Sequence, residues 1–232
     1  MRRLILWDID GTLIRSGKVG RRAVEAGAAM AASLVDVPTV EMSGKTDPQI
    51  LREIFVAADI AEERIVELLP AAVQEVERAL ADAEAELRRD GWVLPGVIEI
   101  LKSLDTVGGV RQSLLTGNLV ANAALKVAAF DLLDYFDVEL GAYGSDDADR
   151  RALVPMALER VQRLRGEYYD LDEVWVIGDT PNDLACAQAA GVRCLVVGTG
   201  AIGADAVLTL DADAVLPDLT DTETVMQILL AG

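Results

Sequence analysis

The chain has 232 residues, 52% of them hydrophobic, which is enough for one sizeable core and a smaller appended unit. Its formal charge of -18 disfavours nucleic acids and anionic membranes as partners, so any anionic ligand needs a local positive site. Histidine is absent, which removes the usual acid–base residue and the commonest zinc ligand. Any chemistry must then rely on carboxylates, lysine or arginine, hydroxyls, or a hard metal ion bound by oxygen.

The N-terminal segment and the apolar runs predict a cytosolic protein without a membrane span. Met1-Arg2-Arg3 is basic, but only four apolar residues separate it from Asp8, which is too short for a signal-peptide hydrophobic region. The longest apolar runs fall well short of the roughly 20 residues that are needed to cross a bilayer.

Short apolar runs that stop abruptly at polar loops predict buried strands, and helical patterns lie between them. The predicted strands are residues 4–7, 110–115, 174–177 and 194–197. The predicted helices between them span residues 121–129, 152–164 and 183–190. This alternation predicts an α/β fold with a parallel sheet covered on both faces, and ligands bind such sheets at the carboxyl ends of the strands.

Residues 18–89 break this alternation. Helices are predicted there at residues 21–34, 48–57 and 62–89, with no convincing strand among them. We therefore expect a core of residues 1–17 and 90–232 and an all-helical insertion of residues 18–89. A lone coiled-coil arm is the alternative for the longest helix, but a packed unit is favoured because the neighbouring helices are short and also amphipathic.

Two carboxylates follow the first predicted strand, in the run Asp8-Ile9-Asp10-Gly11-Thr12. Side chains two residues apart point the same way in an extended chain, although the Gly-Thr pair then turns it. Two buried like charges raise one pKa sharply, so a hard divalent metal is their natural partner. The alternative is an ordinary acidic turn or helix cap.

A second acidic run, Gly178-Asp179-Thr180-Pro181-Asn182-Asp183, follows another predicted strand and precedes a helix. If the strands that carry Asp8 and Asp179 are neighbours, their carboxylates converge into the oxygen-rich shell that Mg²⁺ prefers. Asp183 has a simpler alternative, because Asp is a common N-cap residue.

These runs resemble the motifs of the haloacid dehalogenase superfamily, in the branch with a helical C1-type cap inserted after the first motif. Asp8 to Thr12 matches its D-x-D-G-T motif, Leu115-Thr116-Gly117-Asn118 its hydroxyl-bearing motif, and Gly178-Asp179 with Asp183 its acidic motif. The resemblance covers the whole chain. It implies a Rossmann-like core with the helical insertion as a cap domain.

The resemblance also implies phosphoryl transfer with particular residues in each role. Asp8 is then the nucleophile that forms an aspartyl-phosphate, and Asp10 is the general acid and base. The implied cofactor is Mg²⁺, held by the Asp8 carboxylate, the Asp10 backbone carbonyl and Asp179, with Asp183 supporting the surrounding shell. The residues implied to bind phosphate or substrate are Gly11, Thr12, Thr116, Gly117 and Asn118.

The chain departs from the family at its third motif, which normally supplies a lysine before the acidic strand. Here that region reads Asp149-Arg150-Arg151-Ala152, and no lysine follows Lys126. Because the mechanism needs a cation there, we assign it to Arg150, with Arg151 as the second choice. The alternative is that both arginines are solvated and pair with nearby aspartates.

In the insertion, Lys45 is a candidate for binding a carboxylate of the substrate. The alternative is that Lys45 belongs to an ordinary solvated loop.

The function implied by these residues is that of a magnesium-dependent phosphatase acting on a small phosphorylated metabolite, similar to phosphoglycolate phosphatase. A sugar-phosphate mutase shares the same aspartate pair, and a phosphate-binding module without turnover is a further alternative. A dehalogenase is disfavoured because it does not need Asp10. Phosphonate hydrolysis is disfavoured because neither Lys18 nor Lys45 has the apolar surroundings that a Schiff-base lysine requires. The physiological substrate and the oligomeric state are not predicted.

Overall fold

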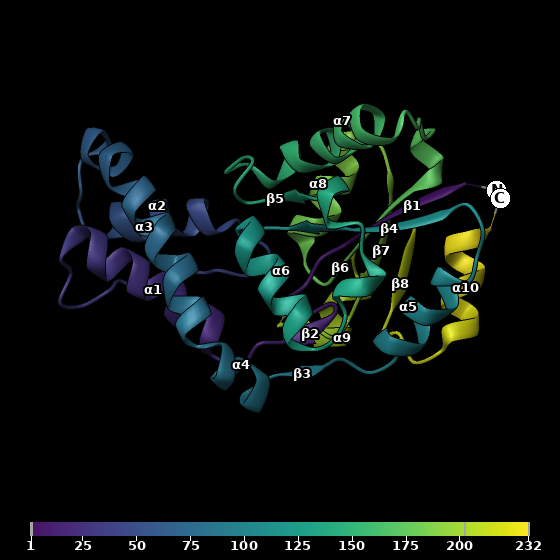
Figure 1. The fold of residues 1–232 in the computed structure, drawn as a ribbon, viewed down its shortest axis with the longest axis horizontal. Coiled ribbons are helices and arrows are strands. Elements are labelled where there is room, and N and C mark those ends of the chain that lie inside the picture. Colours follow the sequence, from purple (N-terminus) through teal and green to yellow (C-terminus); the bar gives the residue numbers. More distant parts are fainter. Residues whose placement is uncertain (1, 202, 232) are drawn as a thin grey trace.

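A twisted parallel sheet forms the larger part of the molecule in the computed structural model, which describes residues 2–201 and 203–231 (Figure 1). Its strands lie in the order β5-β4-β1-β6-β7-β8, and every neighbouring pair is parallel. Their bounds are β1 (Arg3–Trp7), β4 (Val110–Thr116), β5 (Ala142–Tyr143), β6 (Val174–Gly178), β7 (Arg193–Val197) and β8 (Ala214–Leu216). The predicted α/β class with a parallel sheet is confirmed.

Helices cover both faces of this sheet, because alternate residues of each strand point to opposite sides. Ile5 and Trp7 of β1 join the apolar cluster that includes α5 and α10, whereas Leu4 and Leu6 join the cluster that includes α7 and α8. The core helices are α5 (Val97–Asp105), α6 (Val120–Ala129), α7 (Leu153–Arg165), α8 (Pro181–Ala190), α9 (Gly203–Val207) and α10 (Thr222–Leu230). No helix in the described ranges is both long and apolar enough to cross a membrane.

A separate group of helices projects from the carboxyl edge of the sheet (Figure 1). These helices are α1 (Val19–Ala32), α2 (Asp47–Ala57), α3 (Glu62–Asp82) and α4 (Glu84–Asp90). They bury an apolar cluster of their own, which Leu119 and Ala129 from the neighbourhood of α6 join. The chain enters this helical unit after β2 (Ile14–Arg15) and leaves it before β3 (Trp92–Val93). These two short strands pair with each other as an antiparallel ribbon.

The single helix predicted at residues 62–89 is wrong, because the helix breaks at Ala83. On one side of the break, α3 packs along α1 and also contacts α6 of the core, and on the other side α4 packs against α6. Leu87 of α4 is fully buried, and Arg88 donates to the carbonyl of Ala129 at 2.6 Å. The two segments on either side of the break thus share α6 as a packing partner, and the apolar spacing continues through the break.

Candidate active site

Asp8 and Asp179 lie side by side at the carboxyl edge of the sheet. Asp8 follows β1 and Asp179 follows β6, and these two strands are parallel neighbours. The Asp8 amide extends the ladder by donating to the carbonyl of Ile177 at 2.9 Å. Together with Asp183, these residues offer carboxylate oxygens that all lie within 4.8 Å of one another. The strand pairing therefore produces the convergence of carboxylates that we expected.

Asp183 does more than cap its helix. The N-cap of α8 is Thr180, and Asp183 stands three residues later in a reciprocal capping box. Its Oδ2 atom accepts from the Thr180 amide at 3.0 Å, the Thr180 hydroxyl at 2.7 Å and the Asp179 amide at 3.2 Å. Its Oδ1 atom accepts from Arg150. The capping bonds thus fix a fully buried carboxylate beside Asp8.

This crowding of carboxylates shifts their titration. Burial, and then repulsion from Asp183 and Asp8, raise the pKa of Asp179 to about 8. Burial also raises the pKa of Asp8 to about 6, although the nearby Arg150 opposes the shift. Three buried carboxylates with a single guanidinium leave excess negative charge, which a hard cation bound by oxygen would offset. The donor set therefore fits a divalent metal ion.

Gly11 and Thr12 shape the turn beside this cluster. Gly11 has a φ of +95°, and a Cβ there would lie 2.5 Å from Oδ2 of Asp179, so only glycine fits. The Thr12 hydroxyl donates to Oδ1 of Asp179 at 3.2 Å. Gly11 thus leaves room for the Asp179 side chain and Thr12 holds it, roles that the phosphate-binding interpretation did not include.

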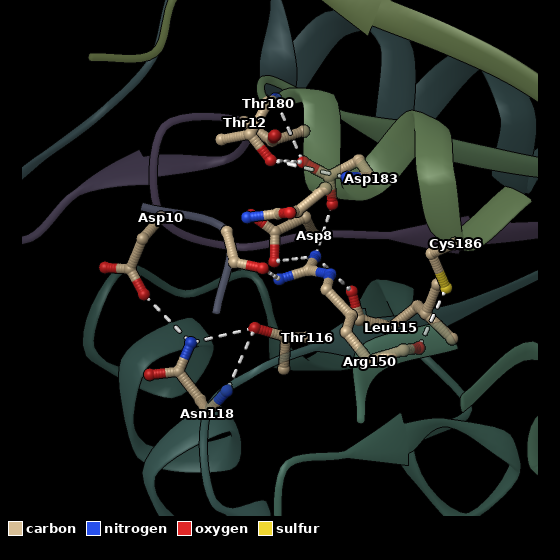
Figure 2. Close-up of polar contacts among 12 residues, drawn as sticks. Asp8, Asp10, Thr12, Leu115, Thr116, Asn118, Arg150, Thr180, Asp183 and Cys186 are labelled. Atoms are coloured by element: carbon tan, nitrogen blue, oxygen red, sulfur yellow. Dashed lines mark hydrogen bonds and ion pairs between the residues drawn. The ribbon is translucent and has the colours of Figure 1, made fainter. Parts of the chain in front are cut away.

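Arg150 lies between Asp8 and Asp183 (Figure 2). It begins a 3₁₀ turn, η3 (Arg150–Ala152), directly before α7, and is only 5% exposed. Its Nη2 atom donates to Oδ1 of Asp8 at 2.9 Å and also to Asp183, while Nη1 donates to the carbonyl of Gly44 at 3.3 Å. The structure thus places this arginine, rather than a lysine, against the proposed nucleophile.

Arg151 and Lys45 lie differently. The Arg151 side chain is 66% exposed and pairs with Asp149, as the alternative interpretation expected for this residue. Lys45 lines the cavity of the site, but its ammonium group bonds Glu53 of α2 at 2.5 Å. The role of Lys45 toward substrate stays a prediction.

Asp10 points away from the carboxylate cluster, toward Asn118 (Figure 2). Its carboxylate accepts from Ser16 at 2.7 Å, Asn118 at 2.9 Å and Lys126 at 2.5 Å. Burial alone would raise the pKa of Asp10, but Lys126 and these hydrogen bonds lower it. Sequence reasoning missed Lys126. The only signal was a lone lysine inside a helix that carries no other charged residue.

Thr116 and Gly117 stand where β4 ends, and Gly117 contacts residues 43–47 of the helical unit, which we call the docked loop. The Thr116 hydroxyl accepts from the Asn118 side chain at 2.8 Å. The Gly117 carbonyl accepts from the amide of Asp47 at 2.8 Å. Asp47 in turn accepts from the Leu119 amide at 3.0 Å, and burial raises the pKa of Asp47 to about 6. These bonds dock the loop onto the core.

Replacing Gly117 with Ala is expected to lower the free energy of unfolding by about 1–3 kcal/mol, the usual cost of overpacking. A Cβ at this position would lie 2.1 Å from the Lys45 carbonyl oxygen, and backbone of the docked loop cannot yield as a side chain can. Urea unfolding measures the effect. Gly108→Ala is the control, because a Cβ there meets nothing within 4 Å. Equal stability of the two variants would contradict the docking of this loop.

The site opens into a cavity of about 260 Å³ between the sheet edge and the helical unit. Asp8, Asp10 and Thr116 line it from the core, and Lys45 and Val76 from the helical unit. A small molecule in this cavity therefore contacts both parts of the chain.

The parallel sheet and the carboxylates at its carboxyl edge define the class of the protein. It is a Rossmann-like α/β enzyme whose site is built from carboxylates. The chain belongs to the haloacid dehalogenase-like hydrolases, because the model of that family matches residues 5–188. This membership confirms the predicted family and the prediction of an enzyme, a hydrolase of the phosphatase type.

Similar proteins agree with this assignment. The chain is 31% identical to phosphoglycolate phosphatase 1 of Pseudomonas aeruginosa over 85% of its own length and 70% of that protein. It is 26% identical to the pyrophosphatase PpaX of Halalkalibacterium halodurans over 94% of each chain. In fold it resembles CbbY from Rhodobacter sphaeroides, solved in complex with phosphate, with a TM-score of 0.69 at 20% identity, covering 95% of this chain and 96% of that one.

Proposed function

We propose that this hydrolase is a Mg²⁺-dependent phosphatase that cleaves a small phosphomonoester through an aspartyl-phosphate on Asp8. The observation that carries the proposal is the position of Asp8, buried between Arg150 and the carboxylates of Asp179 and Asp183 while lining the cavity. Phosphoglycolate is the first candidate substrate, because a relative of 31% identity is named for it.

In the first half-reaction, a carboxylate oxygen of Asp8 attacks phosphorus and the bond to the leaving oxygen breaks. Arg150, which holds Asp8 through its Oδ1 atom, orients the nucleophile and faces the developing negative charge. The lowered pKa of Asp10 makes its protonated form the minor one, and it is this form that gives its proton to the leaving oxygen. The leaving alcohol departs, and phosphate stays bound to Asp8.

In the second half-reaction, Asp10 takes a proton from a water molecule, whose oxygen attacks phosphorus and displaces the Asp8 carboxylate. Phosphate is released, Asp8 is regenerated and Asp10 again carries the proton. Thr116 and the amides of Gly117 and Asn118 bind the phosphate oxygens. These groups stand at the end of β4, directly before α6, where helix N-terminal amides favour an anion.

The residues that would hold the metal ion are Asp8, Asp179 and Asp183, together with the backbone carbonyl of Asp10. When bound, Mg²⁺ supplies positive charge that offsets repulsion between the nucleophile and the phosphate.

Residues 18–89 act as a cap domain that excludes water from the cavity. The docked loop supports this role, since Thr46 and Asp47 both bond the core. Lys45 stays the candidate for reading a carboxylate on the substrate.

The direct test is hydrolysis of an aryl phosphate with Mg²⁺ and with EDTA. We expect EDTA to stop turnover and added Mg²⁺ to restore it. Asp179→Asn is expected to raise the Mg²⁺ concentration for half-maximal activity by at least about tenfold, since it removes a charged donor. Activity that survives chelation would contradict the metal site. A wild-type chain without turnover on any phosphate ester would favour the binding-module alternative.

A panel of phosphorylated metabolites then addresses the substrate. Phosphoglycolate and pyrophosphate enter it first, because relatives are named for them. A cavity of about 260 Å³ is expected to favour small esters over nucleotides, which shows as higher kcat/KM for the small ones.

A further inference from the structure

Lys126 is a buried cation that the mechanism above does not use. It lies on α6, a helix of otherwise uncharged residues, and is 3% exposed. A buried ammonium group is costly unless it is paired and hydrogen-bonded. Its Nζ atom donates to Oδ2 of Asp10 at 2.5 Å and to Oδ1 of Asn118 at 2.6 Å. The charge is therefore satisfied at the edge of the cavity.

The bonds of Lys126 also fix the orientation of the Asn118 amide. A lysine only donates and a carboxylate only accepts, so the amide oxygen must face Lys126 and the amide nitrogen must face Asp10. That nitrogen donates to Oδ2 of Asp10 at 2.9 Å and to the Thr116 hydroxyl at 2.8 Å. The network leaves the Asp10 carboxylate held through both of its oxygens, because Ser16 donates to Oδ1 at 2.7 Å.

The two buried cations of the site serve different carboxylates. Arg150 bonds Asp8 and Asp183, whereas Lys126 bonds Asp10. The ammonium group also has little freedom to move. A Cβ added at Gly20, near the start of α1, would lie 3.3 Å from Nζ, so the helical unit closes tightly over it. Lys126 is thus confined by the cap side and anchored to Asp10 on the core side.

We propose that Lys126 is a positioning residue, which holds the Asp10 carboxylate where it reaches the leaving-group oxygen. The proposal rests on the proposed role of Asp10 as general acid and base. The reaction itself is unchanged: the proton still passes between Asp10 and the leaving oxygen or water. Lys126 keeps Asp10 and Asn118 in the geometry that this transfer requires, because general acids act only within hydrogen-bond reach.

Leaving-group chemistry provides the test. An aryl phosphate has a good leaving group and needs little protonation, whereas an alkyl phosphate such as phosphoglycolate depends on it. Lys126→Met keeps the length of the side chain and removes its charge. We expect kcat to fall by roughly tenfold or more for the alkyl phosphate and by less than about threefold for the aryl phosphate, since general acid catalysis contributes about 10²–10⁴-fold.

The Asp10→Asn background separates positioning from substrate contact. If Lys126 acts through Asp10, adding Lys126→Met to Asp10→Asn lowers kcat no further. Lys102→Met is the matched control, because Lys102 is exposed on α5, and its activity on both esters should equal that of wild type. Thermal denaturation by circular dichroism establishes that each variant is folded. Should the Met variant fail to fold, Lys126→Gln, which retains a hydrogen-bond donor, undergoes the same comparison.

An equal loss on both esters, or a further loss in the Asp10→Asn background, would overturn the positioning role. Unchanged kcat on the alkyl ester would overturn it as well. A wild-type enzyme that is inactive on both esters, or an Asp10→Asn variant as active as wild type, would instead refute the proposed function, and the role of Lys126 would fall with it.

Discussion

Replacing Asp8 with Asn is expected to lower kcat by about 10⁴-fold or more, the scale of losing a catalytic nucleophile. The amide is nearly the same size as the carboxylate, but it is a poor nucleophile and a poor ligand for Mg²⁺. Asp8 is 4% exposed, so a nucleophile from the solvent does not easily take its place. Assays of the alkyl and aryl phosphates with saturating Mg²⁺ measure the loss.

The same variant should stay folded. Burial raises the pKa of Asp8, which means that its charged form is less favourable in the folded chain than in the unfolded chain. Asparagine removes this charge, and Arg150 keeps its bond to Asp183. We expect a melting temperature equal to or above that of wild type. Asp105→Asn, at the exposed end of α5, is the control and should leave kcat unchanged. Residual activity of Asp8→Asn within tenfold of wild type would refute the covalent mechanism.

The strands that appear in the sequence as apolar runs could be predicted. The central strands β1, β6 and β7 are almost entirely buried, so each appears as a nearly continuous apolar segment that ends at a polar loop. The strand β4 also carries Arg111, Gln112 and Ser113, and only its last residues before the loop, Leu114 and Leu115, form an apolar run. The strands β5 and β8 have two and three residues, too few for such a pattern. Similarly, the break at Ala83 leaves the helical spacing intact, and no Gly or Pro in the sequence marks it.

The acidic half of the site could be predicted because its residues stand where strands end. Asp8 and Asp179 meet whenever β1 and β6 are neighbours, and no side-chain detail is needed. The partners of Asp10 could not be predicted in this way. Lys126 lies 116 residues away along the chain, and its direction depends on how α6 packs against the loop after β1.

Local geometry, rather than the sequence, also distinguishes the positions of the two arginines. The Asp149 side chain accepts from the Arg151 amide at 3.0 Å and holds the Arg151 side chain outward. The 3₁₀ turn then directs Arg150 inward, to the carboxyl edge of the sheet. Because both residues are arginines in adjacent positions, the residue types in the sequence do not show which of them points inward.

Replacing Arg150 with Ala is expected to lower kcat/KM by about a hundredfold or more, the scale of losing one preorganised charged donor in a water-poor site. The substitution also leaves Asp8 and Asp183 without their common partner, and breaking a buried ion pair costs about 3–5 kcal/mol of stability. The assay temperature must therefore lie below the melting temperature of the variant, as measured by circular dichroism. Saturating Mg²⁺ keeps any loss of metal affinity out of the comparison.

Two companion variants distinguish a role in the reaction from a purely structural one. Arg150→Lys restores the charge and should recover part of the activity, but a single ammonium group cannot bond Asp8, Asp183 and the Gly44 carbonyl as the planar guanidinium does. Arg151→Ala should stay within a few-fold of wild type, because that side chain is exposed and contacts Asp149 alone among the acidic groups in the described ranges. If Arg150→Ala and the double variant both keep near-normal activity at saturating Mg²⁺, the phosphoryl-transfer site does not use this cation, and the assignment of Arg150 is wrong.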